Sequence, residues 1–362
     1  MPRLYGRDWT RAELLERVGD VSQLGGARPV HYTEGPEAGV QAVEVRTGGG
    51  LSFTVLPGRG MDLGFADYQG ASLCWRSSTG EVHPAFYEAE GERWLRGFYG
   101  GLLVTCGLTT AGWVSVDEGE EQPLHGRASY LAARNVHVDG DWDGDDYVMW
   151  VQGRVRETRV YGENVRLTRR VWARLGEKRL FLDDVVENLG YAPVPHMIAY
   201  HINPGFPVLD EGSQMISTAQ EIEPVNPAWQ DQAADYATLR GPTKDWVSPV
   251  FHHRQRADAD GWAYAALVNR RFPGGGLGLY VKQRPEELPW LWQWKQTGQG
   301  TYVMGMEPAN CRGDGRANER ARGALRFLQP GERQEYHLEI GVLAGEDEIA
   351  AFEGQASAAR GA

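Results

Sequence analysis

Cysteine, long apolar runs and clustered positive charge are all scarce in this sequence. The three cysteines (Cys74, Cys106 and Cys311) are widely spaced and form no Cys-x-x-Cys pair, which argues against a disulfide framework and a structural zinc site. No apolar stretch reaches the roughly 18 residues of a membrane span, and the start MPRLYGRDWTR lacks the apolar core of a signal peptide. The net charge of −12 argues against nucleic acid, because a phosphate backbone is bound by clustered cations. We therefore expect a soluble, cytoplasmic protein that binds neither nucleic acid nor membranes.

What is present is a globular composition with many aromatic rings. Of the 362 residues, 41% are hydrophobic and 24% are charged, a balance typical of folded chains that can bury a large core. Thirteen tryptophans and fifteen tyrosines supply flat apolar faces. Such faces suit sugar rings, but they suit an ordinary β core equally well, so composition alone leaves the ligand open.

Hydrophobic periodicity predicts a mainly β protein that begins with a short helix. Thr10 and Glu13 have the spacing of a capping box ahead of an apolar stripe. Farther along, apolar residues alternate with polar ones, as half-buried strands require. The alternating positions are Leu51, Phe53, Val55, Val165, Leu167, Val171, Ala173, Leu180, Leu182 and Val186. Long helices do not alternate with these strands, which argues against a parallel α/β fold. We expect a helical segment over residues 1–25, a single antiparallel β sandwich over residues 26–353, and a disordered tail over residues 354–362.

Three stretches imitate known motifs without meeting their chemical requirements. "DGDWDGDDY" (139–147) opens like a calcium loop, but Trp150 stands where the bidentate acid is needed. "GGGLGL" (274–279) lacks the Lys-Ser/Thr end of a phosphate loop, and "FHH" (251–253) has no acid at helical spacing beside it. We interpret the first two as turns and expect no metal site in the chain.

Four other stretches place polar side chains on glycine turns or near the ends of strand-like runs. Side chains alternate faces along a strand, so His201 is expected to share a face with Ala199. By the same rule Glu307 shares a face with Gly305. Each polar residue alone also fits a surface or hydrogen-bonding role, but several buried together need one another or a polar ligand. The stretches are "LPGRGMDLG" (56–64) with Arg59 and Asp62, "PLHGRASY" (123–130) with His125 and Arg127, "YHINPGFP" (200–207) with His201 and Asn203, and "YVMGMEPAN" (302–310) with Glu307.

Taken with "GGLLVTCGL" (100–108), these stretches resemble the aldose 1-epimerase (galactose mutarotase-like) superfamily, and within it a bacterial branch of uncharacterised aldose-epimerase-related proteins. The matching stretches run from about residue 50 to 340. The resemblance implies a supersandwich of two large, mostly antiparallel sheets with a cleft lined by one sheet face. This architecture agrees with the period-two pattern, which was read from the residues alone.

The resemblance also implies a chemistry, the interconversion of the α and β anomers of a free aldose. Glu307 would take the proton from the O1 hydroxyl, and His201 would give one to the ring oxygen, as a general base and acid. On this assignment the acid limb of the pH profile belongs to Glu307 and the basic limb to His201. No cofactor is implied. Further residues expected to contact the substrate are Arg59, His125, Arg127, Asn203, Lys282 and Trp294, the last within "LPWLWQWKQTG" (288–298), whose tryptophans equally fit a core ladder.

One departure from the family pattern keeps other functions open. Mutarotases of the superfamily carry a Thr/Ser-Tyr-Phe-Asn-type run after the acid histidine, whereas this chain has Ile202-Asn203-Pro204-Gly205. A pocket rebuilt there fits a different sugar or a reaction at another sugar carbon, with a metal held by His125, His201 and Glu307 as one variant. A third alternative is a non-catalytic carbohydrate-binding domain, although binding alone does not require a paired acid and base. A homodimer is also left open.

Overall fold

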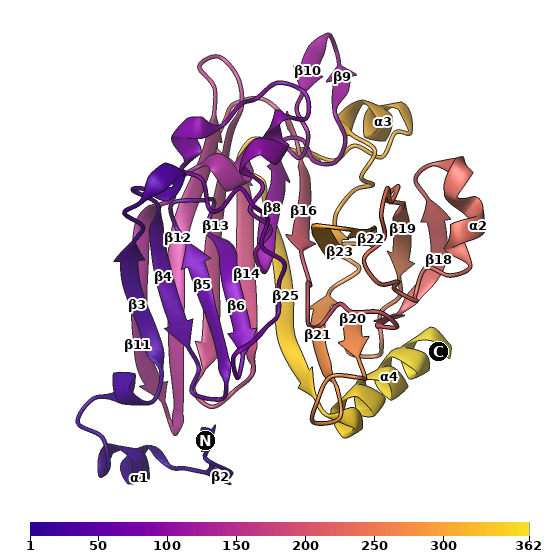
Figure 1. Cartoon of the computed structure of the whole chain (residues 1–362). Coiled ribbons are helices and arrows are strands. Elements are labelled where there is room, and N and C mark those ends of the chain that lie inside the picture. The colour runs from indigo at the N-terminus through magenta and orange to yellow at the C-terminus, as the bar shows by residue number, and fades with distance from the viewer. Residues whose placement is uncertain (362) are drawn as a thin grey trace.

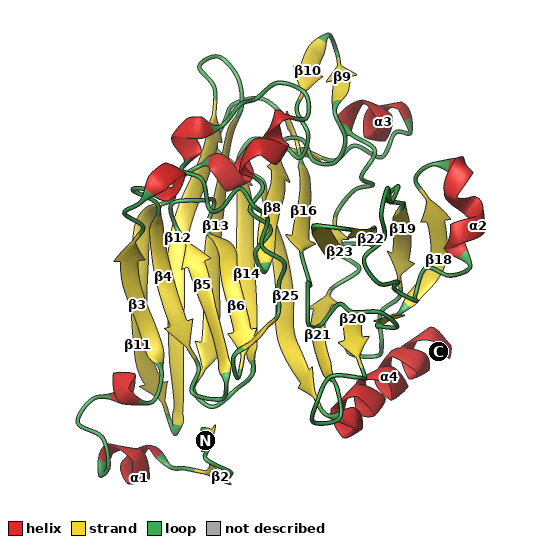
Figure 2. Ribbon diagram, in the orientation of Figure 1, coloured by secondary structure: helices red, strands yellow, loops and turns green. Residues whose placement is uncertain are grey.

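The computed structural model describes residues 1–361 and consists mainly of two large antiparallel sheets that face each other (Figures 1 and 2). The eight-stranded sheet has the order β11 (Arg134–Asp143), β12 (Asp146–Thr158), β13 (Asn164–Arg174), β14 (Arg179–Asn188), β25 (Arg333–Ala344), β21 (Leu277–Gln283), β20 (Ala263–Asn269) and β17 (Gln214–Ser217). The predicted supersandwich is confirmed.

The eleven-stranded sheet carries the candidate site. Its order is β18 (Ala219–Pro224), β19 (Val250–Gln255), β22 (Trp290–Gly298), β23 (Thr301–Ala309), β16 (Met197–Ile202), β8 (Leu103–Leu108), β6 (Asp62–Tyr68), β5 (Leu51–Leu56), β4 (Gln41–Arg46) and β3 (Gly26–His31), with β7 (Ala71–Ser72) beside β6. Strands distant in sequence are therefore neighbours: β16 lies between β8 and β23.

The main core fills the space between the two sheets. It is built from the alternating residues that the sequence pattern singled out, including Leu51, Phe53 and Val55 of β5 and Leu167 and Val171 of β13. Each of these side chains is at most 3% exposed. Burial of one such side chain is worth roughly 1.5–3 kcal/mol, so this layer is the main source of cohesion between the sheets.

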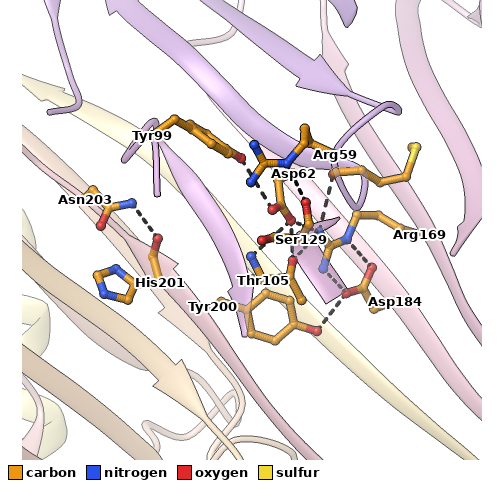
Figure 3. Close-up of polar contacts among 11 residues, drawn as sticks. Arg59, Asp62, Tyr99, Thr105, Ser129, Arg169, Asp184, Tyr200, His201 and Asn203 are labelled. Carbon is orange, nitrogen blue, oxygen red and sulfur yellow. Dashed lines mark hydrogen bonds and ion pairs between the residues drawn. The ribbon is translucent and has the colours of Figure 1, made fainter. Parts of the chain in front are cut away.

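A buried polar network also links the sheets inside this core (Figure 3). Arg169 of β13 donates to both carboxylate oxygens of Asp184, at 2.9 and 2.6 Å, and to the Thr105 hydroxyl of β8 at 2.7 Å. The hydroxyl of Tyr200 in β16 donates to Asp184 at 2.8 Å. Asp62 accepts from the Thr105 hydroxyl at 2.6 Å, and burial raises the pKa of Asp62 to about 6. Because every charged member has a partner, this cluster joins the sheets without an isolated buried charge.

The chain ends differ in how well the sequence predicted them. The predicted capping box at Thr10 and Glu13 is present and opens α1 (Arg11–Leu15). The predicted disorder from residue 354 is wrong for residues 354–361, which lie in α4 (Glu346–Gly361); residue 362 lies outside the described residues. Helix α4 packs Phe352 against Tyr264 and Tyr280 of the eight-stranded sheet, with ring centroids 5.6 and 5.3 Å apart. Ala356 and Ala359 of the same helix are also buried.

The stretches interpreted as turns are turns. "DGDWDGDDY" forms the hairpin between β11 and β12, with Asp143 opposite Asp146. The first three glycines of "GGGLGL", Gly274 to Gly276, connect β20 to β21, and Gly278 lies within β21. Within residues 1–361, no helix combines the length and apolar character needed to cross a membrane.

Candidate active site

The candidate site is a cavity of about 630 Å³ on the face of the eleven-stranded sheet that points away from the eight-stranded sheet. The alternation of β16 defines this face. Ile198 and Tyr200 belong to the core between the sheets, whereas Met197 and Ala199 belong to a second apolar cluster on the opposite face. His201 shares that second face and lines the cavity, as the period-two pattern predicts.

Strand β23 brings Glu307 beside His201. Met304 and Met306 of β23 point into the core between the sheets, so Glu307 points the other way, into the cavity. Strand β16 pairs with β23 so that Ile202 lies opposite Met306. The Nε2 atom of His201 lies 3.3 Å from Oε1 of Glu307. Two strands about a hundred residues apart in sequence thus place an imidazole and a carboxyl group in direct contact.

Burial governs the protonation of this pair. His201 is 4% exposed and Glu307 is 2% exposed. Burial lowers the pKa of His201 to about 4 and raises the pKa of Glu307 well above its ordinary value. Both shifts favour uncharged groups, because removal from water disfavours the charged form. At neutral pH the pair therefore holds one proton, which leaves one acid and one base facing the cavity.

Gly305 makes room for the Glu307 carboxyl group. A Cβ atom at residue 305 would lie 2.3 Å from Oε1 of Glu307 and 2.9 Å from Cβ of Trp294. Real Cβ atoms do not approach other atoms so closely, so a side chain here would displace the carboxyl group. The Glu307 carboxyl group itself occupies the space that a side chain at residue 305 would need.

Aromatic rings form the walls around the pair. Phe98 lies with its ring centroid 5.1 Å from that of His201, and Trp294 lies 5.6 Å from it on another side. Trp94 stacks on Phe98 at 4.7 Å. Trp292 is 2% exposed, and its indole nitrogen donates to the Cys311 carbonyl. The expected position of Trp294 at the cavity is therefore observed, in a setting that suits an apolar sugar face.

His125 enters the cavity from a strained turn rather than from a strand. Its backbone has φ of 56°, and the next residue, Gly126, has φ of 72°. A Cβ atom on Gly126 would lie 2.6 Å from the Gly107 carbonyl oxygen, so the turn requires glycine there. The His125 ring lies 4.8 Å from Trp94 and 5.7 Å from His201, and burial lowers its pKa well below the ordinary value. His125 is thus placed beside the pair as an uncharged imidazole.

Arg59 does not line this cavity, which corrects the expectation that it contacts substrate. Its guanidinium is fully buried and donates to three backbone carbonyl oxygens: Ser129 at 2.7 Å, Val82 at 2.5 Å and Gly97 at 3.1 Å. It also lies over the Tyr130 ring, 4.2 Å from its centroid. The partners that a buried arginine demands are supplied here by loops of the protein itself. Arg59 therefore joins the loop that carries Trp94 to the loop that follows His125.

Asn203 also lies outside the cavity lining. Its amide nitrogen donates to the carbonyl oxygen of His201 at 2.8 Å (Figure 3). It also donates to the carbonyl oxygens of Gly101 and Gly100, at 3.1 and 3.3 Å. The side chain is completely buried. Asn203 therefore fixes the backbone at the end of β16 and supports the position of His201, in place of the substrate contact expected from the sequence.

Two further expected contacts are wrong because their residues lie elsewhere. Arg127 is exposed and lines a different cavity of about 610 Å³, on the other side of the turn that holds His125. Lys282 lies in β21 of the other sheet, where its amino group is 3.4 Å from Glu339. Neither side chain lines the cavity of His201 and Glu307.

The histidines of "FHH" are structural in this fold. His252 accepts from the backbone N–H of Gly313 at 2.9 Å, and His253 is in hydrogen-bonding contact with Gln293 at 3.1 Å. Across residues 1–361, no three His, Cys, Asp or Glu side chains are grouped in a way that could hold a metal ion. His125, His201 and Glu307, which were considered above as a possible metal site, do not form such a group either.

Several residues at the cavity were not foreseen from the sequence. Trp94 lies on the short 3₁₀ helix η4 (Arg93–Gly97), and the others come mostly from loops that have no periodicity. Loops have no repeating backbone geometry, so their sequences show no periodicity, and composition is the only signal left. The stretch "RWLRGF" (93–98) contains two aromatic residues without a regular spacing. The residues missed include Glu92, Trp94, Phe98, Asn226, Asp314 and Asn318.

Solved structures share this fold. A protein described as a "putative aldose 1-epimerase" from Klebsiella pneumoniae subsp. pneumoniae is 27% identical, with a TM-score of 0.87 over 97% of this chain and 94% of that one. A galactose 1-epimerase from Lactobacillus acidophilus is 13% identical, with a TM-score of 0.58 over 88% and 99%. A galactose mutarotase-like protein from Clostridium acetobutylicum is 13% identical, with a TM-score of 0.57 over 89% and 99%. No curated protein matches the chain.

These likenesses define the class: the chain has the carbohydrate-epimerase type of fold found in galactose mutarotase-like proteins. Residues 37–342 match the family described as "Domain of unknown function (DUF4432)", and the chain belongs to that family. The resemblance to the galactose mutarotase-like superfamily, first seen in the motifs, is confirmed at the level of the whole fold.

Proposed function

We propose that the protein is an isomerase that interconverts the α and β anomers of a free aldose by general acid–base catalysis. The contact of His201 with Glu307, 3.3 Å apart in a cavity walled by tryptophans, is the observation that carries the proposal. A binding domain needs no such pair, whereas anomer exchange needs one proton acceptor and one proton donor.

The reaction requires two proton transfers that leave the total proton count unchanged. In the proposed forward direction the proton held by Glu307 first passes to His201 across their 3.3 Å contact. Glu307 then accepts the O1 hydroxyl proton while His201 donates a proton to the ring oxygen, and the C1–O5 bond breaks. Rotation about C1–C2 exposes the other face of the aldehyde. Closure reverses both transfers and regenerates the pair. Because the pair holds one proton, it contains one acid and one base before and after each cycle.

The surrounding residues support this role in distinct ways. Trp294 and Phe98 offer apolar surface against which the carbon face of a ring can lie. His125, beside His201, is placed to hold a ring hydroxyl. The same apolar walls lower the local dielectric constant, which strengthens electrostatic interactions inside the cavity. No step of this mechanism requires a metal or an organic cofactor.

The test is proton NMR of a panel of freshly dissolved pure anomers, followed to equilibrium with and without protein. The proposal predicts that at least one aldose reaches its anomeric equilibrium faster than the spontaneous rate, and that a chelator leaves this acceleration unchanged. The appearance of a second sugar in place of the second anomer would show reaction at another carbon. Spontaneous rates for every aldose tested would contradict the proposal.

A further inference from the structure

The cavity offers few unoccupied hydrogen-bonding groups besides the catalytic pair. The Asp314 carboxylate already accepts from Arg322 at 2.5 and 2.7 Å. The amide nitrogen of Asn318 donates to the Asp314 carbonyl at 2.6 Å, and the side-chain oxygen of Asn226 caps the backbone N–H of Ala228 at 3.0 Å. These polar residues line the cavity, yet both carboxylate oxygens of Asp314 and one side-chain group each of Asn318 and Asn226 are engaged within the protein.

One backbone N–H group and one indole group at the cavity are also engaged within the protein. The N–H of Gly313 donates to His252 at 2.9 Å, and the indole N–H of Trp292 donates to Cys311 at 2.8 Å. What remains on the inner walls is largely carbon: the rings of Phe98 and Trp294 and the side chain of Leu124. Among cavity residues beyond the pair, Trp94, His125 and Ser248 have buried polar side-chain atoms with no partner in the described structure.

A fully hydroxylated sugar needs more partners than this. A hexopyranose carries five hydroxyl groups, of which one, at C1, meets the catalytic pair. Each remaining hydroxyl that is buried without a partner weakens binding on the order of tenfold, because its bonds to water are lost. A carbon–hydrogen face at the same position instead packs favourably on the aromatic walls.

The charges around the cavity further restrict the class of ligand that it can bind. Among the described residues that line the cavity there is no lysine or arginine, and the acidic side chains Glu92 and Asp314 lie at it. The guanidinium of Arg322, which does not line the cavity, is already paired with Asp314. A phosphate or carboxylate on the sugar would therefore face the like charges of Glu92 and Asp314, with no lining cation to neutralise it.

We propose that the preferred substrate is an uncharged deoxy aldose, a reducing sugar that lacks one or more of the usual hydroxyl groups. This inference rests on the proposed function, because it assumes that the reducing end lies at His201 and Glu307. It goes beyond that function by naming the chemical class of the sugar. The specificity arises from a shortage of hydrogen-bonding partners rather than from any added contact.

The test compares matched pairs of sugars that differ by one hydroxyl: fucose with galactose of the same absolute configuration, 2-deoxyglucose with glucose, and 2-deoxyribose with ribose. Glucose 6-phosphate serves as the charged probe. The kcat/KM for anomer exchange is measured by NMR with wild-type protein. The inference predicts a value at least tenfold higher for the deoxy member of at least one pair, a deoxy sugar as the best substrate of the panel, and no acceleration with glucose 6-phosphate. Equal or higher values for the hydroxylated members overturn it.

Binding to Glu307→Gln separates this inference from the proposed function. Tryptophan fluorescence reports binding without turnover, because Trp94, Trp292 and Trp294 line the cavity. The inference predicts at least tenfold tighter binding of the preferred deoxy sugar than of its partner. If this preference is found while wild-type protein accelerates no exchange, the proposed function fails and the ligand class stands. If exchange is accelerated but hydroxylated sugars bind and react as well, the deoxy preference alone is overturned.

Discussion

The imidazole of His201 and the carboxyl group of Glu307 are 3.3 Å apart, and both side chains are almost completely buried. In a surface ion pair, the pKa of the histidine rises and the pKa of the acid falls. Burial does the reverse here: it lowers the pKa of His201 and raises the pKa of Glu307. One proton resides on the pair over a wide pH range, and the two groups titrate as a unit. The site thereby keeps an acid and a base poised together at neutral pH.

The pH dependence of kcat/KM should reflect the titration of the His201–Glu307 pair. The acid limb corresponds to addition of a second proton, on His201, whose pKa burial lowers to about 4. The basic limb corresponds to loss of the shared proton, governed by the raised pKa of Glu307. The limbs are thus assigned in the reverse order from the one expected from the sequence. A pH–rate profile from about pH 3.5 to 10 should show a plateau through neutrality; an acid limb centred near pH 6.5 would contradict the assignment.

Substitution of Gly305 by alanine should reduce activity without unfolding the protein. The new Cβ atom would meet Oε1 of Glu307 at 2.3 Å and force the carboxyl group out of position. A shift of about 1 Å at a catalytic group reduces turnover by on the order of 100-fold. Gly19→Ala is the control, since a Cβ atom there meets nothing within 4 Å. Circular dichroism should show native β structure in both variants; full activity in Gly305→Ala would contradict the geometry.

Arg59 should prove to be a residue that secures loops rather than one that binds sugar. Arg59→Met leaves the carbonyl groups of Ser129, Val82 and Gly97 without their donor. Each buried unsatisfied group costs about 1–3 kcal/mol, so the free energy of unfolding in urea should fall by about 3 kcal/mol or more. Lys282→Met, in the other sheet, should leave kcat/KM unchanged. An Arg59 variant with native stability and weakened sugar binding would restore the direct role in substrate binding.

His196 provides a test of burial away from the site. Its ring lies 2.7 Å from the Tyr336 hydroxyl and 3.0 Å from the Leu108 carbonyl, and burial lowers its pKa to about 4. Between about pH 4 and 6.5 the unfolded chain binds a proton at this histidine that the folded chain does not. Stability due to His196 is therefore present above pH 6.5 and is lost as the pH falls toward 4, by up to about 1.4 kcal/mol per pH unit.

The measurement is urea unfolding of wild type and His196→Gln at several pH values. The wild-type free energy of unfolding should fall more steeply below pH 6.5 than that of the variant, so that the two curves converge. The exposed His137→Gln variant is the control and should run parallel to wild type. Parallel curves for wild type and His196→Gln would show that His196 takes up its proton in the folded state.

The regular strands of this fold could be predicted because period-two alternation reports which face is buried. That rule placed His201 of β16 and Glu307 of β23 on cavity-facing sides, although it could not say that the two strands pair. It could not show that β21 lies in the other sheet, so Lys282 was misassigned. Strand order depends on contacts among distant segments, which no local pattern records.

Loops and the last helix were harder to predict for different reasons. A buried arginine such as Arg59 signals the need for polar partners, but backbone carbonyls satisfy that need as well as a ligand does. Trp94 lies on a 3₁₀ helix too short to show periodicity. In α4, Ile349, Phe352 and Ala356 do have helical spacing, yet the small residues around them resemble a flexible tail in composition.

The proposed roles of the catalytic pair are tested most directly by exchange NMR on an equilibrated sugar that wild-type protein accelerates. Glu307→Gln keeps the shape of the side chain but removes its acid–base function, and His201→Asn removes the imidazole. Each should reduce the α-to-β exchange rate by on the order of 10²–10⁴ while sugar binding changes little, and the double variant should be little worse, because both groups act in one transition state. An exchange rate in Glu307→Gln equal to that of the wild-type protein would contradict the proposed roles.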